Sequence, residues 1–191
     1  MNSIFRIFRR IHNLMLYPAR EWNSIAAENN NRKTIYIRFV LPLLCLIAIA
    51  TVVGTWLATS RELYSAGYVI GKIVNLWASL SVGLYFSAFV ITEIMAPQVE
   101  QRDHHRSFAL MAYSSGAAYL VIFLVALFPF FNELLVLAFY SCYLYWRGIP
   151  YLIQVSGQKQ MTYALLSFII VVLIYSLMFF FFGKILWTIL L

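Results

Sequence analysis

One group of residues that could form a functional site is the motif Tyr-Trp-Arg-Gly-Ile-Pro at residues 145–150. Arg147 lies inside a long apolar segment, where an unpaired charge at the helix centre costs about 2.5 to 3.5 kcal/mol on insertion scales. Gly148 and Pro150 follow within one helical turn, and a proline inside a helix leaves a backbone carbonyl without its usual donor. A charge beside a freed carbonyl is a candidate polar site, and a purely structural kink is the alternative, since proline is common in transmembrane helices.

Glu93, near the end of another apolar segment, is the carboxylate that could compensate Arg147. Three interpretations stay open. The two residues form an ion pair, or Arg147 reaches a lipid phosphate, or the pair belongs to a site for a substrate or an ion.

A second polar group occupies residues 98–106. Glu100 and His104 have the i, i+4 spacing of one helical face, with Asp103 and His105 nearby, so a transition-metal cluster is one interpretation and a solvated loop is the other. Adjacent histidines point in different directions on a helix, which favours the loop. The chain also lacks the His-Glu-x-x-His, Gly-x-Ser-x-Gly and phosphate-loop motifs. We therefore predict no catalytic residues, no metal ligands and no cofactor.

Composition places this chain in a membrane. It has 191 residues, of which 63% are hydrophobic and 11% charged, too few charges for the surface of a soluble domain. The net charge of +7 could suggest nucleic acid, but the basic residues crowd the N-terminus and the ends of apolar segments, so we expect no nucleic-acid partner. Cys45 and Cys142 both lie in apolar segments and are interpreted as buried thiols.

The apolar segments are each long enough, at roughly 20 residues, to cross a hydrocarbon core of roughly 30 Å. We expect an all-α integral membrane protein with five transmembrane helices in residues 36–191, preceded by a basic cytoplasmic segment over residues 1–35. The expected spans run over residues 39–58, 73–95, 108–128, 134–153 and 163–183.

In the N-terminal segment, apolar residues recur at helical spacing over residues 3–16, with arginines on the opposite face. This pattern predicts an amphipathic helix lying at the membrane interface. A tryptophan in the short helix that follows is also expected at headgroup depth. The residues that we expect to contact the bilayer and its anionic headgroups are Arg6, Phe8, Arg9, Arg10 and Trp22.

The distribution of lysine and arginine predicts the topology. Half of the 14 such residues precede the first expected span, and further ones lie after the second span (Arg102 and Arg106) and after the fourth (Lys159). We therefore expect a cytoplasmic N-terminus and a C-terminus outside. The opposite side carries Arg61, Lys72 and Lys184.

The fragments at residues 16–25, 108–116, 138–145 and 148–150 resemble, in order and spacing, the Yip (Ypt/Rab-interacting) membrane domain family, in its bacterial type. The resemblance covers nearly the whole chain and implies an all-helical membrane domain without established catalytic chemistry. Eukaryotic relatives act in membrane trafficking and bind small GTPases and one another, while bacterial relatives are inner-membrane proteins. Arg147 departs from the pattern, because many relatives have an apolar residue there. The long acidic or proline-rich tail of eukaryotic members is also absent, so GTPase binding does not carry over.

Two functions follow as hypotheses. The first is a non-enzymatic interaction or membrane-organising protein of a bacterial inner membrane, which predicts copurifying protein or lipid partners or a homo-oligomer. The alternative is a small transporter or channel subunit with a polar site near Arg147 and Glu93, which predicts a continuous polar cavity.

Overall fold

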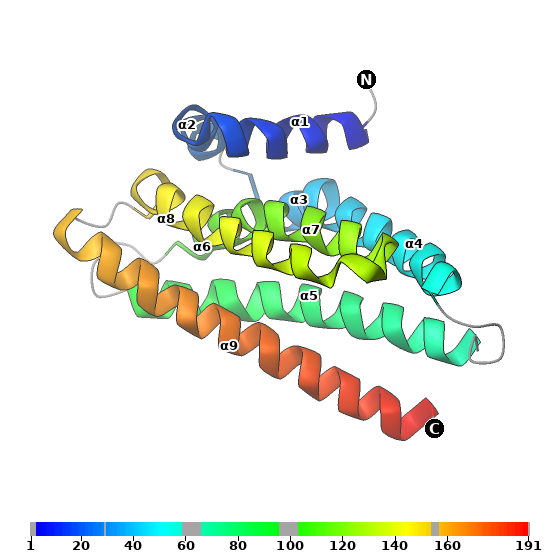
Figure 1. Cartoon of the computed structure of the whole chain (residues 1–191). Helices are drawn as coiled ribbons and strands as arrows, with labels where there is room; N and C mark the ends of the chain where they lie inside the picture. Colours follow the sequence, from blue (N-terminus) through cyan, green and yellow to red (C-terminus); the bar gives the residue numbers. More distant parts are fainter. Residues whose placement is uncertain (1–2, 29, 59–65, 96–102, 154–156, 191) are drawn as a thin grey trace.

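The computed structural model describes residues 3–28, 30–58, 66–95, 103–153 and 157–190, and every regular element in them is helical (Figure 1). This agrees with the expected all-α fold. In chain order the elements are α1 (Ser3–Leu16), α2 (Pro18–Glu28), α3 (Arg32–Ile35), the π-helix η1 (Tyr36–Val40), α4 (Leu41–Ala58), α5 (Ala66–Met95), α6 (His104–Ser114), α7 (Gly116–Leu127), the 3₁₀-helix η3 (Pro129–Phe139), α8 (Tyr140–Leu152) and α9 (Gly157–Leu190).

Within the described residues, 4 helical stretches are long and apolar enough to cross a bilayer. They overlap the spans expected at residues 39–58, 73–95, 108–128 and 163–183. These stretches are Arg32–Ala58, Ala66–Ile94, His104–Leu127 and Met161–Leu186.

The segment expected as a span over residues 134–153 has a different structure. It consists of η3 followed by α8, which is only 13 residues long, so it is not among the long α-helical stretches. Pro129 begins η3 and cannot donate a backbone hydrogen bond, and Phe131 departs from helical geometry with φ −107° and ψ 46°. Regular α-helix resumes only at Tyr140.

A turn at Ser115 divides the third long stretch into α6 and α7. Amides in the first turn of a helix have no acceptor within that helix, and an unsatisfied amide is costly where lipid replaces water. Ser141 of α8 supplies the acceptor, because the amide of Ala118 donates to its Oγ at 2.9 Å. This hydrogen bond fixes α8 against the start of α7.

The N-terminal helices pack against the bundle. Figure 1 shows α1 lying over the side of the bundle and extending in nearly the same direction as α5. The inner face of α1 is buried, with Ile7, Ile11 and Leu14 at most 4% exposed, and α1 contacts α7. The periodicity predicted an interfacial helix over these residues, and the central apolar face of α1 contacts protein. An outer edge that includes Phe5 and Phe8 stays exposed.

Trp22 differs from the headgroup position that we expected for it. Its side chain is 0% exposed, and its indole lies against α8 at Gly148. A Cβ built on Gly148 would lie 2.8 Å from two atoms of the Trp22 ring and 2.5 Å from Leu110 of α6. The missing side chain at Gly148 therefore lets α2 approach α8 closely enough for the indole to enter the core.

The polar segment at residues 98–106 contributes a helix cap. The side chain of Asp103 accepts hydrogen bonds from the amides of His105 at 2.8 Å and Arg106 at 3.1 Å, which satisfies two donors at the start of α6. Glu100 lies outside the described residues. Among the residues that are described, no three His, Cys, Asp or Glu side chains are close enough to hold a metal ion.

Candidate functional site

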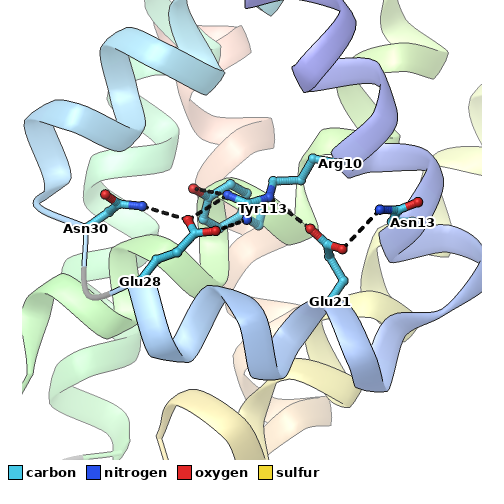
Figure 2. Close-up of polar contacts among 6 residues, drawn as sticks. All are labelled: Arg10, Asn13, Glu21, Glu28, Asn30 and Tyr113. Carbon is cyan, nitrogen blue, oxygen red and sulfur yellow. Dashed lines mark hydrogen bonds and ion pairs between the residues drawn. The ribbon is translucent and has the colours of Figure 1, made fainter.

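A partly buried ionic network joins the two N-terminal helices to the bundle, and Arg10 of α1 lies at its centre (Figure 2). Its Nε donates to Oε1 of Glu21 at 3.0 Å, and its Nη1 donates to Oε2 of Glu28 at 2.8 Å and to the Tyr113 hydroxyl at 3.2 Å. Its Nη2 contacts the other oxygen of Glu28. The guanidinium thus makes a two-pronged contact with one carboxylate and a single contact with another.

Two asparagines hold these carboxylates in place. Asn13 donates to Glu21 at 3.2 Å, and Asn30 donates to Glu28 at 2.8 Å. The arrangement follows from helical spacing, because Glu21 and Glu28 are two turns apart on α2 and face the same way. Figure 2 shows both acids directed toward Arg10 from one side of that helix.

The charge of Arg10 is stabilised by this network. Burial by itself disfavours the charged form, but the hydrogen bond to Glu28 and the charges around it outweigh burial, so the pKa of Arg10 is raised above its usual range. The guanidinium carbon also lies 5.1 Å from the centre of the Tyr113 ring, a cation–π contact. The side chains of Arg10 and Glu21 are only 20% and 14% exposed, so water screens their attraction less than at an open surface.

The network forms part of an open cleft of about 830 Å³, which we call the N-terminal cleft. Its walls are α1, α2 and the helical stretch from Thr34 to Phe39, and Tyr113 contributes from α6. The volume lies in the range of small-ligand sites. The lining carries an excess of positive charge and can therefore attract anions. Its charged residues are Arg6, Arg9, Arg10, Arg38, Glu21 and Glu28.

The expected polar site in α8 is built differently from what the motif suggested. The Arg147 side chain is partly buried, and its Nε has no hydrogen-bond partner in the described part of the chain. Among the same residues, no ion pair joins Arg147 to Glu93. Gly148 is buried for the packing reason given above, whereas Pro150 is exposed, and α8 continues past it to Leu152. None of these four residues lines the N-terminal cleft.

Comparison with protein families gives a match to the Yip1 domain over residues 13–183, which is most of the chain. The chain belongs to the Yip1 domain family. Comparisons with curated proteins and with solved structures give no match. Together with the apolar helices, family membership makes this an integral membrane protein.

The Yip1 match divides the N-terminal cleft. It includes Glu21, Glu28, Arg38 and Tyr113, but it starts after Arg10. The part of α1 that carries three of the four lining arginines therefore precedes the matched region, whereas Asn13 is the first matched residue.

The sequence of this Yip1 protein predicted that Arg6, Arg9 and Arg10 contact lipid headgroups, but the sequence analysis missed the acids that bind Arg10. A signal for those acids was present, since two glutamates at a spacing of seven lie on one face of a predicted helix. Such spacing predicts a shared face. It does not predict which basic helix will cover that face.

Proposed function

We propose that this protein is a non-enzymatic member of its family that crosses the membrane five times and acts as an interaction or membrane-organising protein in a bacterial inner membrane. The observation that carries the proposal is the N-terminal cleft, an open charged surface built on a rigid helical base. Its walls are fixed by the Arg10 network, and exposed apolar side chains of α1 adjoin it, including Phe5 at 61% exposure. A charged cleft with an apolar border fits partner or lipid binding.

Geometry supports a fifth crossing through η3 and α8. A 3₁₀-helix rises about 2.0 Å per residue and an α-helix about 1.5 Å, so the two elements together reach at most roughly 40 Å. Most side chains of η3 are strongly exposed and apolar, including Phe130 at 72% and Val136 at 64%. A bilayer would cover such a surface.

The side of the membrane on which Lys159 lies distinguishes five crossings from four. If η3 and α8 cross, Lys159 lies on the same side as the N-terminus, in the cytoplasm; if they do not, it lies outside. In a variant without Cys45 and Cys142, we expect Lys159→Cys to stay unlabelled by an impermeant maleimide in intact cells and to react after permeabilisation. Arg61→Cys is the matched control, and we expect it to react in intact cells. Labelling of Lys159→Cys from outside would contradict the proposed topology.

Crosslinking from the exposed edge of α1 tests the interaction role. With a photoreactive amino acid in place of Phe5, illumination of native membranes is expected to give discrete adducts with a partner protein or a second copy of this chain. The control is the same substitution at Trp56, which is 68% exposed on α4 and should react mainly with bulk lipid. An absence of protein adducts at Phe5, together with solute flux in proteoliposomes, would contradict the proposal and favour a transporter.

A further inference from the structure

The N-terminal cleft contains three arginines that the Arg10 network leaves available. Arg10 takes both glutamates of the lining, and the asparagines complete their hydrogen bonds. Within the described residues, Arg6, Arg9 and Arg38 have no hydrogen bond or ion pair of their side chains, and all three are exposed. The cleft thus presents exposed guanidinium groups, while the two glutamates of its lining are bound to Arg10.

These arginines approach one space from two walls. Arg6 and Arg9 lie three residues apart on α1, on the same face as Arg10, and Arg38 enters from η1. Planar guanidinium groups on opposite sides of a cleft can bind the oxygens of a phosphate group with paired hydrogen bonds. The hydroxyl groups of Ser24 and Thr34 also line the cleft and can donate to the same ligand.

The cleft adjoins the point in the first long stretch where the charged residues end. Arg38 is its last charged residue, because residues 39–58 contain no charged side chain. Such a boundary marks the depth of the lipid phosphates. Ile7, Ile35 and Phe39 also line the cleft, and each is at most 4% exposed, so their side chains pack mainly against protein. Exposed guanidinium groups at this boundary match the phosphate of a lipid headgroup.

We propose that the N-terminal cleft binds the phosphate headgroup of an anionic phospholipid, with Arg6 and Arg9 on one side and Arg38 on the other. This inference deepens the proposed function by naming a lipid ligand, and it rests on the chain being membrane-embedded. It differs from general attraction of a basic helix to a charged surface. Binding in the cleft should depend on Arg38 of η1 as well as on the arginines of α1. It should not depend on exposed basic residues elsewhere.

The test uses the full chain in neutral detergent micelles and measures binding of dioleoylphosphatidylglycerol, with dioleoylphosphatidylcholine as the zwitterionic comparison. We expect the wild type to prefer the anionic lipid. We expect the double variant Arg9→Gln/Arg38→Gln to bind it about tenfold more weakly, the scale of a lost charged hydrogen bond. The matched control is Arg20→Gln/Lys33→Gln, which removes the same charge from exposed positions outside the cleft and should change affinity less than about twofold.

Three results would overturn the proposal: equal weakening in both double variants, unchanged binding in Arg9→Gln/Arg38→Gln, or full displacement of the lipid by inorganic phosphate at constant ionic strength. The last would assign the cleft to free phosphate. Circular dichroism checks folding, and if the double variant is unfolded, Arg38→Gln alone should show a smaller loss in the same direction. The assay needs no protein partner, so its result is independent of the crosslinking experiment.

Discussion

The variant Gly54→Leu is expected to prevent assembly of the bundle. Gly54 of α4 lies against the C-terminal end of α7, where a Cβ would overlap the carbonyl oxygen of Ala126 and lie 2.9 Å from that of Leu127. Both are backbone atoms, so no change of rotamer can relieve the overlap. The two helices must separate, and the packing between α4 and α7 is lost with them.

At Gly54, helix propensity and overpacking have opposite effects on stability, so substitutions there test the packing of α4 against α7. Alanine favours a helix over glycine by about 1 kcal/mol, so propensity alone would stabilise Gly54→Ala. Overpacking typically costs about 1 to 3 kcal/mol and more where backbone must move, so we expect Gly54→Ala to destabilise and Gly54→Leu to eliminate the monodisperse peak in size-exclusion chromatography. Gly67→Leu is the control, because a Cβ there meets nothing within 4 Å. Equal recovery of Gly54→Leu and Gly67→Leu would show that α4 and α7 do not pack closely at this point.

Hydropathy predicted the long helices because their apolar composition is a property of each segment alone. It misjudged the segment at residues 134–153, where η3 and α8 replace one long α-helix. Hydropathy sums do not register the proline at the start of η3 or the non-helical geometry of Phe131. Total apolar length can indicate that a segment suits lipid, but hydrogen-bond geometry decides whether it forms a single α-helix.

The candidate site was less predictable because it depends on contacts between distant segments. An amphipathic pattern shows that α1 has an apolar face, yet protein and lipid are equally apolar partners for it. The pairing of Arg10 with Tyr113 spans 103 residues, and no local spacing contains it. The position of Trp22 likewise depends on Gly148, whose role is the absence of a side chain.

Trp22→Ala is expected to lower the stability of the protein by about 3 to 5 kcal/mol, the range for truncating a fully buried tryptophan. The loss removes the contact between α2 and α8, so we expect the N-terminal helices to become sensitive to protease before the bundle does. Thermal unfolding in micelles, followed by far-UV circular dichroism, measures the effect. Trp56→Ala is the control, since that side chain is 68% exposed and its loss leaves no internal cavity.

A double-mutant cycle with Gly148→Ala then tests the specific contact. Alone, Gly148→Ala should destabilise by about 1 to 3 kcal/mol, because its methyl group would overlap the Trp22 indole and the end of Leu110. Without the indole the methyl group has room, so Gly148→Ala should cost less in the Trp22→Ala background, with a coupling of about 1 kcal/mol or more. Additive effects would mean that the indole does not rest on Gly148. The same contact positions α2, and α2 carries the two glutamates that hold Arg10, so in the Gly148→Ala variant protease should cut the N-terminal helices sooner.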